Sequence, residues 1–286
     1  MSEDARGRIA AEIDRLALGT HVADLELQGL AVVRPELVGG PQLADQMLEL
    51  VLDLMERRNG VRPDPASGAT HTNVCFPTLY FFLFEDELFE QWLLHPVMRA
   101  LVDHLLGEQC ILHTTTVFMK GPTDPPVDGL QLGLHSDQQM VPDPFPPYAL
   151  IAGATLLLTD YTRENGAFAF VPGSHRAARH PVGQESIDRV VPVEAPRGSL
   201  LVHHGALWHG SFGRTTPGLR AGLAYAYSRM FVTPLEAYRE RVTKEILDRN
   251  PPRFASLLGQ HVPTGYTEDG PDLTTVGHAV ARSPWD

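Results

Sequence analysis

Apolar residues follow a helical period in the first part of this chain and a strand-like pattern after it. They recur at helical spacing over residues 4–18 and 41–58, which predicts two helices. The short apolar run Leu30–Val33 between them predicts a strand. A further helix is predicted over roughly Asp86–Leu106, where Gly107 is a suitable stop. We therefore expect a mostly helical amino-terminal part.

From Cys110 onward the chain consists of runs rich in Val, Ile, Leu, Thr, Phe and Tyr, separated by turns with Pro and Gly. Many short strands of this kind are typical of a double-sheet jelly roll of the cupin type. The expected fold class is mainly β with flanking helices around a jelly-roll core, and a helix is predicted near 234–248. The predicted strands span residues 111–120, 130–138, 149–159, 166–171, 189–193, 199–204, 207–212 and 219–230.

A single domain is the expected organisation for 286 residues, because β-sandwich and barrel enzymes of this size commonly form one. Residues 1–109 would supply helical support and a loop on the substrate side, 110–230 the core, and 231–286 a helix and a tail. The loop is predicted over Gly60–Thr78, which is rich in Pro, Gly, Ser, Thr and Asn. Loops of this length are often functional, so we expect this one to border the active site.

The composition is that of an ordinary globular protein, with 43% apolar and 20% charged residues. The formal net charge of −12 and the absence of any cluster of Lys and Arg argue against nucleic acid as a partner. The charged amino terminus and the lack of a long apolar run predict no membrane segment and a cytoplasmic location. Cys75 and Cys110 lack metal-ligand spacing and are expected to be buried free thiols. The sequence leaves the oligomeric state open.

The first candidate for chemistry is the pair His135 and Asp137 in a predicted strand. Side chains two residues apart point to the same face of a strand, so the imidazole and the carboxylate can converge on one metal ion. An H-x-D pair alone is common by chance, and two exposed polar strand residues are the alternative interpretation.

A third ligand is expected from the segment 198–211, in which an apolar strand, a turn and a second strand carry histidines. His209 would complete a set of two histidines and one carboxylate, which leaves three positions of an octahedral ion open for a chelating cosubstrate and O2. His203 and His204 compete with His209 for this role, but they precede the turn. One of them could instead be a core histidine or a partner of the ligands.

The residues after His209 favour it as the ligand. Arg220 begins a long alternating strand, and a guanidinium is the best match for the far carboxylate of a dicarboxylate cosubstrate that chelates the metal through its 2-oxo acid end. Ser211 lies two residues beyond His209, on the same face, and could add a hydroxyl donor. Arg214, in a turn, and Arg229, at the far end of the strand, are less well placed.

Several motifs occur in order between about residues 110 and 230. The H-x-D at 135–137 is followed by the hairpin Glu164-Asn-Gly166, by V-P-G-S-H-R at 171–176, by L-W-H-G-S at 207–211 and by Arg220. In this combination, of which V-P-G-S-H-R is the most specific part, the sequence resembles the phytanoyl-CoA dioxygenase family of iron(II)/2-oxoglutarate oxygenases.

The resemblance implies a double-stranded β-helix and an enzyme that uses Fe(II), the cosubstrate 2-oxoglutarate, and O2. Because halogenating relatives replace the carboxylate of H-x-D with a small residue, Asp137 favours hydroxylation or another oxidative outcome over halogenation. Desaturation, ring formation, epimerisation and endoperoxidation stay open beside hydroxylation. The implied substrate is a small metabolite or biosynthetic intermediate. The implied site residues are His135, Asp137 and His209 for the metal, Arg220 and Ser211 for the carboxylate of 2-oxoglutarate, and Thr155 as a further residue against the cosubstrate.

Other residues are given structural roles. His175, in the V-P-G-S-H-R turn, is expected to belong to an anchor of strand ends and not to the metal site. The proline-rich stretch Val141–Tyr148 is either a lid or rim loop of the site or a rigid surface connection. Possible apolar walls from this region are Met140, Phe145 and Tyr148, and the histidines expected to be satisfied or exposed are His71, His113 and His180.

Two other function classes stay open. A non-redox zinc or manganese isomerase of the cupin kind could use the same three ligands, although it would give Arg220 no role. A catalytically silent small-molecule binder could retain the pocket, although it would have no chemical need for all three ligands together with the arginine.

Overall fold

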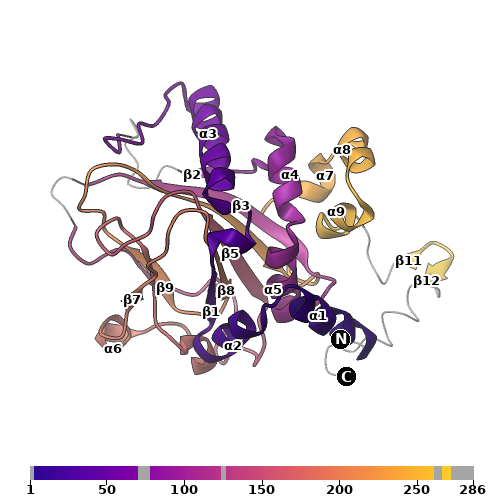
Figure 1. The fold of residues 1–286 in the computed structure, drawn as a ribbon. Helices are drawn as coiled ribbons and strands as arrows, with labels where there is room; N and C mark the ends of the chain where they lie inside the picture. The colour runs from indigo at the N-terminus through magenta and orange to yellow at the C-terminus, as the bar shows by residue number, and fades with distance from the viewer. Residues whose placement is uncertain (1–2, 70–77, 124–126, 261–265, 272–286) are drawn as a thin grey trace.

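Two antiparallel sheets form the core of the protein, which we describe from a computed structural model over residues 3–69, 78–123, 127–260 and 266–271. The large sheet lies between the small sheet and most of the helices (Figure 1). In spatial order the large sheet contains β1 (Leu30–Val33), β8 (Leu200–His204), β5 (Ile151–Leu157), β10 (Arg220–Ser228), β3 (Ile111–Lys120) and β2 (Thr78–Tyr80). The small sheet contains β4 (Leu130–His135), β9 (His209–Phe212), β6 (Phe168–Phe170) and β7 (Val191–Pro192).

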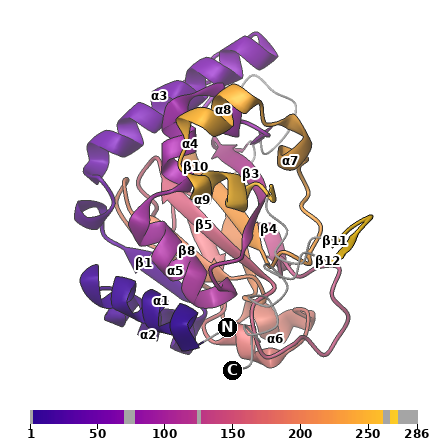
Figure 2. The same cartoon turned by 90° about the vertical axis from the view of Figure 1, so that its right-hand side faces the viewer.

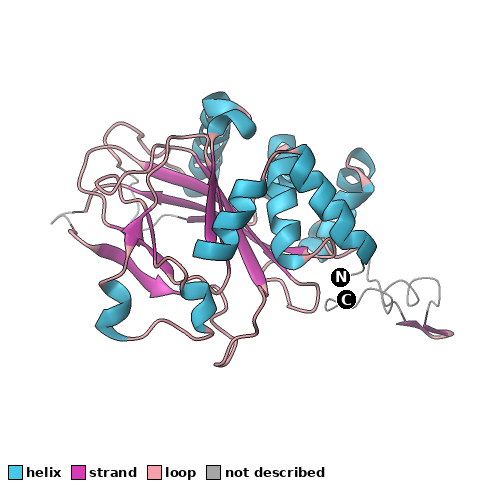
Figure 3. Cartoon of the chain, turned by 60° about the horizontal axis from the view of Figure 1, so that its bottom comes forward, coloured by secondary structure: helices cyan, strands magenta, loops and turns pink. Residues whose placement is uncertain are grey.

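The helices gather mainly on one side of the strands (Figure 3), and the view onto that side shows α4, α5 and α9 in front of the large sheet (Figure 2). None of the described helices is both long and apolar enough to cross a membrane, and their bounds are as follows. The helices are α1 (Glu3–Arg15), α2 (Gly19–Gln28), α3 (Gly40–Asn59), α4 (Glu87–Leu93), α5 (Pro96–Leu106), α6 (Gly183–Ile187), α7 (Tyr238–Arg241), α8 (Lys244–Arg249) and α9 (Pro252–Leu257). Shorter elements are the 3-10 helices Pro35–Leu37, Leu83–Glu85 and Ser174–Ala177 and the strands β11 (Tyr266–Thr267) and β12 (Gly270–Pro271).

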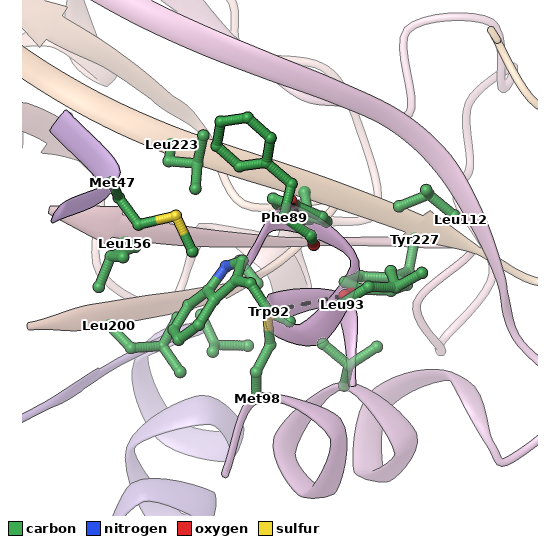
Figure 4. Packing of buried hydrophobic residues seen from close by; sticks show 14 of the residues in the cluster. Met47, Phe89, Trp92, Leu93, Met98, Leu112, Leu156, Leu200, Leu223 and Tyr227 are labelled. Atoms are coloured by element: carbon green, nitrogen blue, oxygen red, sulfur yellow. Dashed lines mark hydrogen bonds between the residues drawn. The ribbon is translucent and has the colours of Figure 1, made fainter. Parts of the chain in front are cut away.

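The main hydrophobic core fills the space between the helices and the outer face of the large sheet. Met47 of α3 and Trp92 of α4 lie close to Leu156 and Leu223 of the sheet (Figure 4), and all four are buried. Each fully buried large apolar side chain contributes roughly 1.5–3 kcal/mol to the free energy of unfolding. This packing makes the large sheet a firm support for the residues on its inner face.

Strand alternation gives the two faces of the large sheet different chemistry. In β5 the even-numbered residues 152, 154 and 156 belong to the core, whereas the odd-numbered residues 151, 153 and 155 line a cavity. The cavity also takes residues from β4 and β9 of the small sheet. It therefore lies between the two sheets, where a jelly-roll enzyme is expected to bind its ligands.

The predicted helical parts needed correction. The helix predicted over 86–106 is two helices, because His95 adopts an extended conformation before Pro96, and a residue before proline disfavours the helical region. The helix predicted near 234–248 is likewise two short helices, since Thr243 is extended and caps the second through the amide of Ile246. The helices α2, α6 and α9 and the strands β2, β11 and β12 were not predicted.

The strands agree with the prediction in order and, for most, in length. The strand predicted over 189–193 is confined to Val191–Pro192, and the one predicted over 166–171 to Phe168–Phe170. Cys110 is a buried free thiol, as expected, and Cys75 lies outside the described residues. The predicted loop 60–78 is irregular over the part that is described, and residues 70–77 lie outside it.

Candidate metal and cosubstrate site

His135, Asp137 and His209 meet between the two sheets. His135 ends β4 and pairs directly with His209 at the start of β9, so the two rings lie 4.3 Å apart between their centroids. Each of the three side chains offers one possible ligand atom, a ring nitrogen or a carboxylate oxygen. These three atoms lie within 4.8 Å of one another. Among the described residues this is the one group of three such side chains that could hold a metal ion.

Backbone carbonyls orient both imidazoles. The Nδ1 atom of His135 lies 3.1 Å from the carbonyl oxygen of Gly133, and Nδ1 of His209 lies 2.9 Å from that of Leu207. A carbonyl oxygen only accepts hydrogen bonds, so each Nδ1 donates and each Nε2 keeps its lone pair for the shared centre. Such partners are the usual way in which proteins fix a metal-binding histidine.

The charge states also suit a cation. Burial lowers the pKa of His209 to about 3, against the opposing effect of Asp137, so its ring is neutral near pH 7. Burial alone would raise the pKa of Asp137, but His209, His203 and His135 together hold it below its usual range. Two histidines and one carboxylate form the donor set that divalent iron binds in non-haem oxygenases.

A second group of polar side chains lies at the start of β10. Arg220 is buried, its guanidinium carbon is 4.4 Å from the centre of the Tyr161 ring, and its Nε has no hydrogen-bond partner. No carboxylate among the described residues pairs with it. A buried guanidinium without an anion is costly, so this arrangement suits an anionic ligand.

Lys120 is a residue of this group that we did not predict. It pairs with Arg220 across β3 and β10, and its Nζ donates to Ser211 Oγ at 2.7 Å and to the carbonyl of Phe212 at 2.8 Å. Burial and then the charge of Arg220 lower the pKa of Lys120 to about 6. Ser211 thus accepts from Lys120 and can still donate its own hydrogen to a carboxylate.

The cavity that joins the two groups has a volume of about 820 Å³. His135, Asp137, His209, Arg220, Ser211 and Thr155 all line it, so the six residues predicted from the sequence lie together. Arg214 and Arg229 are bound elsewhere to backbone carbonyls, as their positions indicated. Much of the remaining wall is apolar, with Phe118, Leu132, Met140, Val141, Leu150, Ile151, Phe168, Val232 and Leu235.

Two further histidines line the cavity: His113, and His203, which the sequence left open as a rival ligand, a core histidine or a partner of the ligands. His113 was expected to be satisfied or exposed, but it is buried in β3, lines the cavity and has no partner for Nδ1. His203 also lines the cavity, and its Nε2 lies 2.9 Å from Asp137 Oδ2. His180 is satisfied, as expected, by the carbonyl of Val141 at 3.0 Å, and His71 lies outside the described residues.

The proline-rich stretch contributes to the cavity only at its beginning. Met140 and Val141 line it, as the sequence indicated for Met140. Phe145 and Tyr148 were wrongly expected in its wall, because they line a separate cavity together with His175 and His204. The ring of Phe145 packs edge-on against His180, which turns it away from the metal ligands.

The V-P-G-S-H-R turn is structural, as predicted. The amide of Gly173 donates to the carbonyl of Gln28, and the guanidinium of Arg176 donates to that of Glu26, so the turn holds the end of α2. Ser174 Oγ accepts from the amide of Trp208 at 2.9 Å, directly before the candidate ligand His209. The turn therefore helps to place the start of β9, and His175 is not part of the metal site.

Comparison with known proteins identifies the same family as the sequence motifs do. The family model described as phytanoyl-CoA dioxygenase (PhyH) matches residues 25–222. Dioxygenase af480 of Aspergillus fumigatus is 31% identical over 199 residues, which are 68% of this chain and 62% of that protein. Dioxygenase trt7 of Aspergillus terreus is 28% identical over 188 residues, with 62% of each chain covered. The chain thus spans less than two thirds of the length of these curated relatives.

Solved structures share the fold. HygX from Streptomyces hygroscopicus, solved with nickel and 2-oxoglutarate bound, has a TM-score of 0.57 and 18% identity over 76% of this chain and 89% of that one. The 2-oxoglutarate-dependent epimerase SnoN from nogalamycin biosynthesis has a TM-score of 0.55 and 21% identity over 75% and 83%. The expected double-stranded β-helix is therefore confirmed. Since the family model covers more than half of the sequence, this chain belongs to the phytanoyl-CoA dioxygenase family of iron(II)- and 2-oxoglutarate-dependent oxygenases.

Proposed function

We propose that this protein is a dioxygenase that hydroxylates an uncharged, largely apolar small molecule, with succinate and CO2 as the products of 2-oxoglutarate. The observation that carries the proposal is one cavity that holds a His-Asp-His group, a buried arginine without an anion, and an extensive apolar wall. Iron(II), with 2-oxoglutarate and O2, would supply an oxidant strong enough for an unactivated C–H bond.

In this proposal His135, Asp137 and His209 hold the iron. Two histidines and one carboxylate would supply three ligands, which would leave the remaining positions of an octahedral ion to the cosubstrate and O2. The hydrogen bonds to the carbonyls of Gly133 and Leu207 keep each Nε2 directed at the ion. The three ligands need no large rearrangement to bind, which lowers the cost of forming the site.

Arg220 binds the far carboxylate of 2-oxoglutarate. The ring of Tyr161 supports one face of the guanidinium, which limits its motion and directs its N–H groups. Ser211, which is held by Lys120 from behind the cavity wall, adds a hydroxyl donor beside it, and Thr155 lines the same cavity. The cosubstrate is thus held at both ends, which positions it relative to the metal.

The wall indicates the class of substrate. Apart from Asp137, the described residues that line the cavity include no carboxylate, and apart from Arg220 they include neither lysine nor arginine. A charged substrate would lose its hydration without gaining an ion pair, at a cost of several kcal/mol. An apolar molecule gains about 25 cal/mol for each Å² that it buries. Coenzyme A esters fit this wall poorly, because their phosphates need cations.

The first experiment is an anaerobic titration of Fe(II) and then 2-oxoglutarate into the metal-free protein, followed by visible absorption. We expect the charge-transfer band of an iron(II)–2-oxoglutarate chelate, and we expect His209→Ala to lose it. Activity without 2-oxoglutarate would support the cupin isomerase instead. If neither a band nor any turnover is found, the protein is a silent binder. When the band forms, substrate-triggered succinate release becomes the assay for candidate substrates.

The state of Lys120 predicts that 2-oxoglutarate binding takes up a proton near neutral pH. With its pKa lowered to about 6, Lys120 is mostly neutral at pH 7, and an incoming carboxylate stabilises its charged form. The affinity for 2-oxoglutarate should therefore be highest below about pH 6 and fall as the pH rises above it. Calorimetry in buffers of different ionisation enthalpy measures this uptake. Equal heats in all buffers, or the same uptake in Lys120→Met, would contradict the prediction.

A further inference from the structure

His203 and its neighbour His204 point to opposite faces of β8, because side chains alternate along a strand. His204 lies on the outer face, where its ring centroid is 5.2 Å from that of His175. His203 lies in the cavity, with its ring centroid 4.8 Å from that of His209. One of two adjacent, chemically identical residues therefore belongs to the surroundings of the metal ligands, and the other provides a natural control.

The two oxygens of Asp137 have different partners. Oδ2 lies 2.9 Å from Nε2 of His203, whereas Oδ1 lies 3.5 Å from Nε2 of His209. An ionised carboxylate only accepts hydrogen bonds, so His203 donates from Nε2 to Oδ2, and its Nδ1 has no partner.

The neighbouring strand leaves room for this ring. Gly153 of β5 is the register partner of His203, and a Cβ atom at Gly153 would lie 2.1 Å from Cε1 of His203. A glycine inside a strand costs roughly 0.5–1 kcal/mol relative to alanine. The ring of Phe168 lies on another side, with its centroid 5.4 Å from that of His203. The position of His203 thus depends on a space that any other residue at 153 would fill.

We propose that His203 is a positioning residue that makes Asp137 a one-oxygen ligand. By holding Oδ2, it leaves Oδ1 as the oxygen directed at the ion. A carboxylate that was free to turn could bind through both oxygens and occupy a position needed by 2-oxoglutarate or O2. The inference rests on the proposed metal site, and it assigns His203 an effect on metal binding that is independent of turnover.

The test uses Co(II) as the probe, with its affinity measured by chelator competition and its geometry by the visible d–d spectrum. We expect His203→Phe to weaken Co(II) binding about 10- to 100-fold, the usual effect of losing a partner of a metal ligand, and to change the spectrum. His203→Gln retains an N–H donor and should recover part of the affinity. His204→Phe, the same change one residue further, should leave both readouts unchanged.

A double-mutant cycle with Asp137→Ala links the effect to the carboxylate. Once Asp137 is absent, His203→Phe should cause no further loss of Co(II) affinity. Gly153→Ala, which displaces the ring without changing it, should reproduce the effect of His203→Phe, so the test does not depend on one variant that folds poorly.

The outcomes distinguish a failure of the proposed metal site from a failure of the proposed role of His203. If the wild-type protein binds no Co(II), or if Asp137→Ala binds it equally well, the metal site itself is wrong. If the wild-type protein binds Co(II) through Asp137 and both His203→Phe and Gly153→Ala bind it with wild-type affinity and spectrum, the role of His203 is wrong. A loss in His203→Phe that persists without Asp137 would also overturn it.

Discussion

Asp137→Ala should abolish iron-dependent turnover and weaken metal binding by more than about 100-fold, beyond the range expected for a residue that only supports a ligand. Asp137 supplies the one negative charge among the three candidate ligands, and its oxygens contact His203 and His209. Its removal leaves only the two imidazoles, which hold a divalent cation weakly. Metal content and turnover, measured after reconstitution with Fe(II), check this result.

The fold should survive the same change. The carboxylate is a partner of cavity residues and not of the hydrophobic core, so the metal-free variant should unfold near the wild-type temperature. Asp128→Ala is a suitable control, because Asp128 is 92% exposed and its ion pair with Arg163 lies on the surface. Full activity of Asp137→Ala, with Fe(II) still bound, would remove the metal assignment.

Arg220→Ala should raise the concentration of 2-oxoglutarate needed for half-saturation by roughly 30-fold or more. Truncating one partner of a buried, hydrogen-bonded charge pair costs about 2–5 kcal/mol, and 1.4 kcal/mol corresponds to a factor of ten. Arg220 is buried and lies over Tyr161, so no other guanidinium can easily replace it. Titration of the charge-transfer band with 2-oxoglutarate measures the affinity directly.

Two comparisons make this result specific. Arg220→Lys should restore only part of the affinity, since an ammonium lacks the planar fork that binds both oxygens of a carboxylate. Arg15→Ala, which removes an arginine whose side chain is 61% exposed and far from the cavity in sequence, should have no effect. The Fe(II) affinity of Arg220→Ala should stay close to that of the wild type. An unchanged 2-oxoglutarate requirement would instead assign the carboxylate to Lys120 or Arg214.

Much of the site could be predicted because its signals are local. The spacing of His209 and Ser211 places two side chains on one face of β9. The strand predicted over 130–138 ends at His135, so Asp137 lies in the bend that follows β4 and reaches His209 from there. Arg220 was recognised by its position at the start of an alternating strand. The choice of His209 over His203 and His204 needed the motif around it, since alternation alone allows either His203 or His204 to face inward.

Some errors came from local signals that were given too little weight. Pro96 is a helix-start residue, and its effect on His95 was available from the sequence, yet one helix was predicted across both. The helix α2 has one fully buried apolar residue, Leu25, so its hydrophobic period is faint. Its place is decided by the turn at 171–176, far away in the chain, which binds its last carbonyls.

By itself the sequence determined the family, the order of most strands and the identity of the proposed ligands, because strand alternation and motifs act over a few residues. Tertiary structure decided which distant side chains complete the site. His203 of β8 reaches Asp137, which follows β4, and Lys120 of β3 reaches Ser211 of β9, only because the large and the small sheet lie face to face. Phe145 and Tyr148 line another cavity, together with His175 and His204. Such contacts depend on which strands pair, in what register, and how the sheets then face each other. The native arrangement is the one that minimises the free energy of the whole core, so it leaves no local pattern in the sequence.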